Sequence, residues 1–225
     1  MTIAIGMTFR DGFILAADRQ ITASGSHKYE AEKIFLIEGI HWNVFLTYCD
    51  SPAIAKEAAE KIEAALRPFE IGFSSEDYEP PRFRDVREKI EGTLNEISNK
   101  HYDSPPVQLL IVIECGPEPT KMFLYQDKAF CPAPDFEVLG CADSSLLHYL
   151  KQTYSKQDSL EYGQKLAAYM VSKAIDFVDK CGKGIDILLV EQVGIWDWLT
   201  KEQIDKILFE VKEREVSTLR KMISG

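Results

Sequence analysis

Two pairs of amphipathic segments, each following a group of short apolar runs, limit the folds that this chain can adopt. The first pair spans residues 52–66 and 82–99, where apolar residues recur at the spacing of one helix face. The second pair spans residues 144–155 and 159–178, and a further helix is predicted to begin at Thr200. Each pair needs another layer on which to bury its apolar face.

The apolar runs between these helices have the length and the residue types of β-strands. They cover residues 3–9, 13–18, 34–37, 42–48, 107–115, 121–126, 136–139, 185–190 and 193–199. Two sheets, each covered by one helical pair, would bury all of the apolar faces. No linker-like composition divides the chain, so the sequence predicts an α+β fold, a four-layer αββα sandwich, in a single domain over residues 1–225.

Two connections have the composition of turns and loops. Arg10-Asp11-Gly12 joins the first two strands, and an Asp-Gly pair supplies the positive φ that a tight hairpin needs. Residues 69–81 are polar and end in Pro80-Pro81, which predicts a long exposed loop between the helices of the first pair.

Charge and composition exclude several classes of function. The chain has 26 basic and 36 acidic residues, a net charge of −10 and no dense cluster of Lys and Arg, so we expect no nucleic-acid partner. Five cysteines without a C-x-x-C pair and four scattered histidines favour neither a disulfide framework nor a metal site, and no cofactor motif is present. No apolar run approaches the ~18 residues of a membrane span. The sequence therefore predicts a cytoplasmic protein without a membrane partner.

The first residues carry the groups of a nucleophilic site. Removal of Met1 would leave Thr2 at the terminus, where a hydroxyl nucleophile and a free amine that titrates near pH ~8 lie on one residue. A nearby ammonium would stabilise the developing alkoxide and help keep the amine unprotonated, and a carboxylate would orient that ammonium. Lys33 and Asp18 are the candidates for these groups. If Met1 is retained, the amine becomes a peptide nitrogen and the base is lost.

Taken together, these positions resemble the proteasome β-subunit family of N-terminal-nucleophile hydrolases, including its bacterial proteasome-like members. The family pattern has a threonine four residues before a glycine, then a hairpin with a D-G start and an acidic end, then a lysine in a K-[IL]-F context. The matching residues are Thr2, Gly6, Asp11, Gly12, Ala16, Asp18, Lys33 and Phe35. These motifs cover residues 2 to 36, and the order of strands and helices extends the resemblance along the chain.

The resemblance implies a threonine-type endopeptidase that needs no cofactor and encloses its site within a homo-oligomer. Its substrate would be a peptide or an unfolded protein, and an ATPase partner, common in the family, leaves no signature in these residues. The implied catalytic residues are Thr2, Asp18 and Lys33. The family's D-x-x-S-G segment falls near Asp179-Lys180-Cys181-Gly182, which adds Asp179. This segment is one residue shorter than the family pattern and places a thiol where a hydroxyl is expected.

Other positions depart from the family pattern. The strand end expected to carry glycine and an oxyanion-hole N–H falls at residues 45–50, which contain no glycine. The supporting serine falls at Cys141 in direct register, with Ser144 as a substitute. Two alternatives follow from the same fold. One is an amidase or acyl-transfer enzyme with the same nucleophile, and the other is a non-catalytic assembly or interaction protein that retains Met1.

Overall fold

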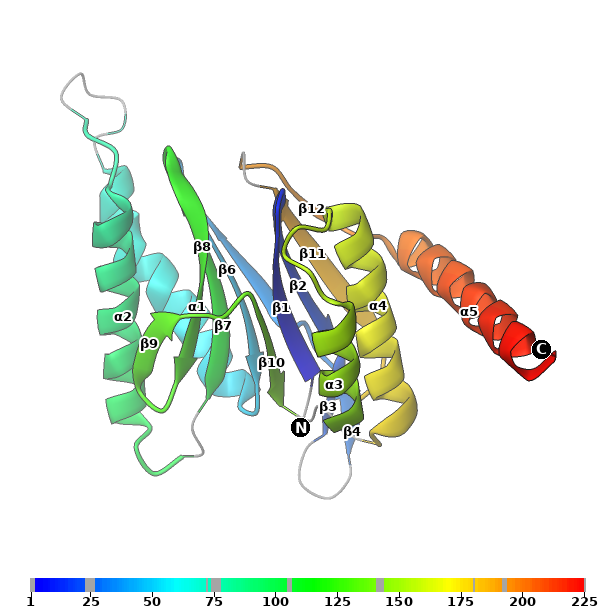
Figure 1. The fold of residues 1–225 in the computed structure, drawn as a ribbon. Helices are drawn as coiled ribbons and strands as arrows, with labels where there is room; N and C mark the ends of the chain where they lie inside the picture. Colours follow the sequence, from blue (N-terminus) through cyan, green and yellow to red (C-terminus); the bar gives the residue numbers. More distant parts are fainter. Residues whose placement is uncertain are drawn as a thin grey trace.

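The computed structural model describes residues 3–22, 27–71, 73, 78–104, 107–140, 144–179, 181–191 and 194–224. Over these ranges the chain forms a mixed helix and sheet structure. Two five-stranded sheets pack against each other, with helices on their outer faces (Figure 1). The mixed content agrees with the α+β class expected from the sequence.

The first sheet has the strand order β10-β1-β2-β11-β12, with every neighbouring pair antiparallel. Its strands are β1 (Ile3–Phe9), β2 (Gly12–Asp18), β10 (Phe136–Gly140), β11 (Ile185–Glu191) and β12 (Trp196–Trp198). The two central strands β1 and β2 are buried along almost their whole length, which a sheet covered on both faces requires.

The second sheet follows the order of the chain, β5-β6-β7-β8-β9, and is also antiparallel. Its strands are β5 (Ile34–Glu38), β6 (Trp42–Cys49), β7 (Gln108–Cys115), β8 (Glu118–Gln126) and β9 (Ala129–Pro132). In the segment of the chain between β2 and β5, a small hairpin pairs β3 (Gln20–Thr22) with β4 (Lys28–Glu30).

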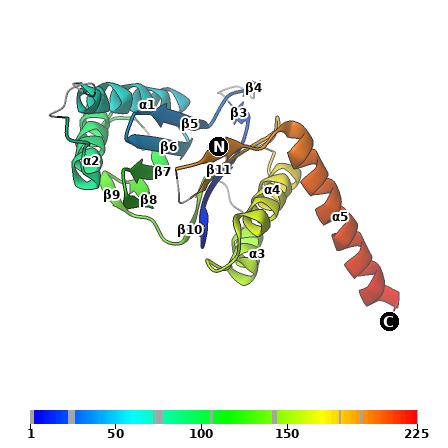
Figure 2. The same ribbon diagram turned by 90° about the horizontal axis from the view of Figure 1, so that it is seen from above.

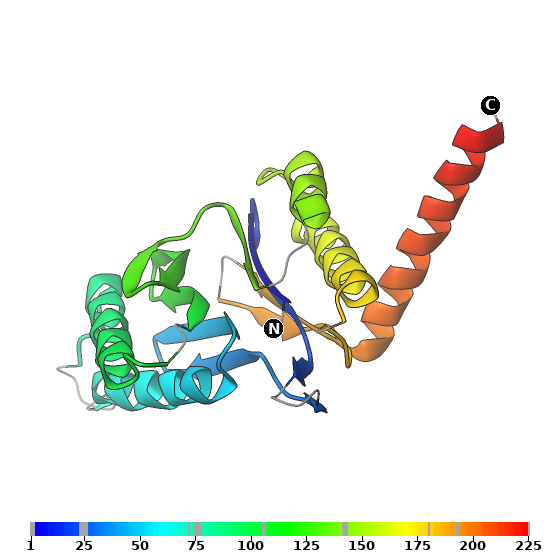
Figure 3. The ribbon, with the colours of Figure 1, turned by 90° about the horizontal axis from the view of Figure 1, so that it is seen from below.

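Helices cover the outer face of each sheet. On the second sheet lie α1 (Pro52–Leu66), the short 3₁₀ helix η1 (Arg67–Glu70) and α2 (Phe83–Lys100), and on the first lie α3 (Ser144–Thr153) and α4 (Leu160–Phe177). Capping by Ser51 and Ser159, whose hydroxyls accept from the amides of Ile54 and Tyr162, starts α1 and α4. A last helix, α5 (Lys201–Ser224), packs on α4 through Ile204 and Ile207 and then extends away from the body (Figures 2 and 3).

The buried apolar side chains form three clusters. One lies between α1, α2 and the second sheet, and one lies between the other helices and the first sheet. The third lies between the two sheets and includes Ala4, Leu15, Phe45, Leu110 and Leu188. Alternation along each strand sends successive side chains to different clusters, as the period of two in a β-strand dictates.

Most of the elements expected from the sequence are present, with three differences. The short β3–β4 hairpin and the edge strand β9 were not expected, because they carry no run of alternating apolar residues. The first hairpin forms as expected, but its loop residues Arg10 and Asp11 do not have positive φ. Gly12 begins β2, where a Cβ would lie 2.2 Å from the Val190 carbonyl oxygen, so this glycine permits close approach of β11.

Candidate active site

A buried ion pair joins the two sheets at one end of the molecule. Asp18 is the last residue of β2 in the first sheet, and Lys33 directly precedes β5 in the second. The Lys33 Nζ lies 2.7 Å from the Asp18 Oδ1, and both side chains are fully buried. Such a pair is stable only if its remaining hydrogen-bonding capacity is satisfied.

The Asp18 carboxylate has further partners from three segments. Its Oδ1 accepts the amide of Ile3 at 3.0 Å, and its Oδ2 accepts the amides of Gln20 at 3.1 Å and Gly182 at 3.0 Å. Three backbone N–H groups and one ammonium therefore donate to this carboxylate. The same contacts fix the first residue of β1 beside Lys33.

The Lys33 ammonium is held in a defined position. In addition to Asp18, it donates to the Gln20 carbonyl oxygen at 2.6 Å. Burial lowers the pKa of Lys33 below the usual lysine range, and the Asp18 charge opposes that shift. A desolvated ammonium close to a reacting group is a strong electrostatic stabiliser of an oxyanion.

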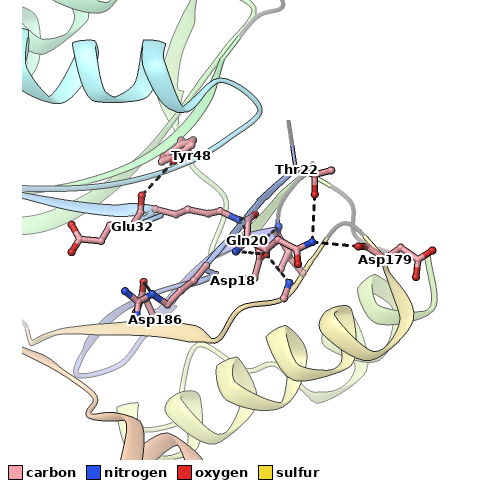
Figure 4. A network of polar contacts seen from close by, with 11 residues as sticks. Asp18, Gln20, Thr22, Glu32, Tyr48, Asp179 and Asp186 are labelled. Atoms are coloured by element: carbon pink, nitrogen blue, oxygen red, sulfur yellow. Dashed lines mark hydrogen bonds and ion pairs between the residues drawn. The ribbon is translucent and has the colours of Figure 1, made fainter. Parts of the chain in front are cut away.

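Of the four residues expected to be catalytic, Asp18 and Lys33 are brought together by the structure. Thr2 lies outside the described residues, but its neighbour Ile3 is bonded to Asp18. Asp179 is exposed, and its backbone carbonyl rather than its carboxylate takes part in the network, accepting Lys28 Nζ at 2.6 Å and Gln20 Nε2 at 3.3 Å (Figure 4). Cys141 and the side chain of Ser144 are also outside the described residues.

Two thiols lie close to the charged pair. Cys181 is 5% exposed and lies against the backbone of Ile3, and burial raises the pKa of its thiol to about 11, with the Asp18 charge adding to the shift. Cys49 ends β6, and its thiol lies 3.1 Å from Asp50 Oδ2 and 3.2 Å from Gln108 Oε1. Burial raises the pKa of Cys49 as well. Burial thus favours the protonated form of both thiols, which is the less nucleophilic form.

The end of β6 turns without a glycine. Asp50, directly after the strand, has a φ of 77°, the left-handed conformation that glycine favours and that Asp tolerates better than most residues. The strand end therefore adopts a conformation that glycine favours, with a residue that carries a side chain.

Sequence reasoning missed Gln20, Lys28 and Gly182, which complete the network around the pair. The contacts of Gln20 and Lys28 with Asp179 join residues more than 150 positions apart, so no local pattern signals them. Gly182 carried the one available signal, because the D-x-x-S-G resemblance already placed a glycine there. Its N–H is the atom that reaches Asp18.

The described residues contain no group of three His, Cys, Asp or Glu side chains arranged to hold a metal ion. Over the same ranges, none of the helices has the length and apolar character needed to cross a membrane.

Comparison with known proteins finds one family and several structural relatives. The model of the proteasome subunit family matches residues 2–190. A proteasome subunit beta from Archaeoglobus profundus is 24% identical over 214 residues, which cover 94% of each chain.

Similar solved structures include Anbu proteins. A mutant of Anbu from Hyphomicrobium sp. strain MC1 has a TM-score of 0.79 at 15% identity and covers 100% of this chain and 97% of its own. Anbu from Yersinia bercovieri has a TM-score of 0.76 at 13% identity, with 97% and 96% covered. The Anbu complex from Pseudomonas aeruginosa, solved as a helical assembly, has a TM-score of 0.77 at 15% identity, with 99% and 95% covered. At these identities the likeness concerns the fold alone.

Proposed function

The chain belongs to the proteasome subunit family, and from that premise we propose that it is a threonine-type peptidase whose nucleophile is Thr2 after removal of Met1. The Thr2 hydroxyl attacks a peptide carbonyl, and the Thr2 amine accepts the hydroxyl proton. The C–N bond then breaks, the amine returns the proton to the leaving nitrogen, and water hydrolyses the ester that remains. Asp18 and Lys33 are assigned to the electrostatic part of this reaction.

The observation that carries the proposal is the shared use of the Asp18 Oδ1 by Ile3 and Lys33. This one oxygen accepts the Ile3 amide at 3.0 Å and the Lys33 ammonium at 2.7 Å. Because Ile3 directly follows Thr2 in the chain, the contact supports the assignment of Asp18 and Lys33 to the same site as the proposed nucleophile. That ammonium lowers the pKa of a neighbouring amine and stabilises a developing oxyanion.

The remaining parts of the proposal concern architecture and context. We assign residues 1–225 to one proteasome-like domain, in which the two sheets and their helical coverings form a four-layer αββα sandwich. The protein acts as a cytoplasmic homo-oligomer that encloses the site and admits peptides or unfolded proteins. The helical assembly of the Pseudomonas aeruginosa relative supports self-association in this fold. Asp179 is assigned a backbone role, since its carbonyl contacts Gln20 and Lys28.

Replacement of the nucleophile tests the proposal. Thr2→Ala removes the hydroxyl, so turnover of fluorogenic peptides is expected to fall to background while the assembly size by gel filtration stays unchanged. The matched control is Thr153→Ala on α3, whose exposed hydroxyl donates to Tyr149 of the same helix and which should keep full turnover. Wild-type turnover in Thr2→Ala contradicts the proposal. Turnover of small amides without peptides would favour an amidase with the same nucleophile.

A second candidate function is a non-catalytic assembly or interaction protein that retains Met1. It is favoured by the positions where side-chain hydroxyls and carboxylates of the family are missing from the network, namely Cys181 and the exposed Asp179. In that function the buried pair of Asp18 and Lys33 only joins the two sheets. Retention of Met1 together with absence of turnover in the purified wild-type protein would support it.

A further inference from the structure

Gln20 is a buried polar residue that the proposed reaction leaves without a role. It is 4% exposed, and its side-chain Nε2 donates to the Asp179 carbonyl oxygen at 3.3 Å and lies 3.4 Å from the Thr22 hydroxyl (Figure 4). A buried carboxamide costs free energy unless it is hydrogen-bonded, so its position here depends on the segment that contains Asp179.

The backbone of the same residue contacts both charged groups of the site. The Gln20 amide donates to Asp18 Oδ2 at 3.1 Å, and its carbonyl oxygen accepts Lys33 Nζ at 2.6 Å. Gln20 therefore contacts Asp18 and Lys33 through its main chain, and through its side chain it contacts the turn after α4, of which Asp179, Cys181 and Gly182 are described.

The turn itself contributes to the charged pair. The Gly182 amide donates to Asp18 Oδ2 at 3.0 Å, and a Cβ on Gly182 would lie 2.9 Å from Gln20 Oε1, so the carboxamide packs directly on this glycine. After Gly182, the Arg19 amide donates to the carbonyl oxygens of Gly182 and Gly184, each at 3.1 Å. Before Gly182, the Gln20 side chain donates to the Asp179 carbonyl oxygen.

We propose that Gln20 is a positioning residue, whose carboxamide holds Asp179 and packs on Gly182, so that the Gly182 amide stays directed at Asp18 and Asp18 in turn fixes Lys33. The inference rests on the proposed threonine-peptidase function and adds a residue that supports its site. Gln20 acts through the turn and the charged pair and does not touch the substrate.

Loss of the carboxamide has a defined electrostatic consequence. The Asp179 carbonyl oxygen accepts bonds from Gln20 Nε2 and Lys28 Nζ. Without Nε2 the bond from the exposed Lys28 remains. If the turn moves, Asp18 loses a hydrogen-bond donor and attracts Lys33 more strongly, and water reaches the ammonium. Both changes raise the pKa of Lys33.

The variants are Gln20→Met and Gln20→Leu, which keep an uncharged side chain and remove the donor. Gln152→Met on α3 is the matched control, because it makes the same change at an exposed glutamine whose Nε2 lies 2.9 Å from His148 Nε2, away from the charged pair. The first measurement is the rate of inactivation by a peptide epoxyketone, which reacts only with a terminal hydroxyl and its amine together. We expect a fall of about 10- to 100-fold for the Gln20 variants, as for other displaced catalytic groups, and less than about threefold for Gln152→Met.

A second measurement does not depend on activity. NMR titration of the ¹³Cε of Lys33 and hydrogen exchange of the Gly182 amide are compared between wild type and the variants. The proposal predicts a higher Lys33 pKa and faster Gly182 exchange in Gln20→Met and Gln20→Leu, with neither change in Gln152→Met.

The outcomes distinguish a failure of the proposed peptidase function from a failure of the proposed role of Gln20. A wild-type protein that forms no epoxyketone adduct would contradict the peptidase function, while the Lys33 titration would still test the positioning link. Unchanged Lys33 titration and Gly182 exchange in both Gln20 variants would overturn the role of Gln20, whatever the activity. A Gln20 variant that loses folded structure by circular dichroism is replaced by the other, which gives the same readouts.

Discussion

The opening strands and the turn after α4 contribute to the same site in different ways. Residues of the first region, Asp18 and Lys33, place fully buried charged side chains in it. The second region places backbone groups there, the Gly182 N–H and the Asp179 carbonyl. The side chain of Cys181 is a thiol with a raised pKa, and the carboxylate of Asp179 is exposed. We conclude that the first region supplies the buried charged groups of the site and that the second supports them through its backbone.

The strand end at Cys49 and Asp50 resembles the second region. It provides a left-handed backbone turn and a buried thiol rather than a charged group directed at Lys33. Substitutions of side chains are therefore expected to have large effects at Asp18 and Lys33 and small effects at Cys181, Cys49 and Asp50.

The largest effect is expected for Lys33→Met. The variant leaves the Asp18 carboxylate buried without its ammonium, which costs on the order of 3–5 kcal/mol of unfolding free energy. Inactivation by a peptide epoxyketone should fall by at least about 100-fold, since a positioned electrostatic stabiliser is lost. Denaturant unfolding and adduct formation by mass spectrometry measure the two effects.

The matched control for this substitution is Lys173→Met on α4. Lys173 pairs with Glu215 at 3.1 Å in a partly exposed position, so its loss should cost less than about 1 kcal/mol and leave adduct formation unchanged. Equal effects of the two lysine variants would remove the distinction between the buried pair and ordinary surface pairs.

The next effect concerns the pH dependence of stability. Burial lowers the pKa of Lys33 in the folded chain, so the unfolded chain binds the additional proton in the window between the folded pKa and the unfolded value near ~10.4. The free energy of unfolding should therefore rise with pH across that window. The measurement is a series of denaturant unfolding curves for wild type and Lys33→Met, and the rise should be absent in the variant. A fall with pH specific to wild type would mean that Asp18 outweighs burial.

A smaller effect is expected at the end of β6. Asp50→Gly removes a side chain from a backbone with a φ of 77°, which should raise the unfolding free energy by up to about 1 kcal/mol. The exposed Asp103, which is not among the residues with positive φ, is the control, and Asp103→Gly should lower stability. Epoxyketone reaction should change by less than about threefold in Asp50→Gly. A loss as large as that of Lys33→Met would show that this strand end carries side-chain chemistry.

The smallest effect is expected at Cys181. Its pKa is raised to about 11 and its side chain is 5% exposed, so iodoacetamide at pH 8 should label the exposed Cys131 well before Cys181, as peptide mapping can resolve. Cys181→Ser should alter adduct formation by less than about threefold. Rapid labelling of Cys181 with loss of adduct formation would give the second region a chemical role of its own.

Much of the fold could be predicted from periodicity. Apolar residues recur at the spacing of one helix face in residues 82–99, and those that form this face, Phe83, Val86, Ile90, Leu94 and Ile97, are all buried. The β3–β4 hairpin could not be predicted, because its strands are three residues long and Lys28, Tyr29 and Glu30 are exposed. Three-residue strands without an apolar face give no pattern to detect.

The site divides in the same way. Asp18 and Lys33 could be predicted as a pair from motif spacing, although an isolated lysine is seldom fully buried. The role of the turn that holds Asp179 and Gly182 could not be predicted, because it depends on a backbone N–H and a carbonyl, and every residue except proline carries both. Only the folded structure shows that the Gly182 N–H meets Asp18 and that the Asp179 carbonyl meets Gln20.

The most direct test of the central claim is the intact mass of the purified protein before and after exposure to a peptide epoxyketone. The account predicts a chain that lacks Met1 and gains one adduct, which the Thr2→Ala variant does not form. A chain that keeps Met1 and gains no adduct would contradict the peptidase function and leave the buried pair of Asp18 and Lys33 as a link between the two sheets.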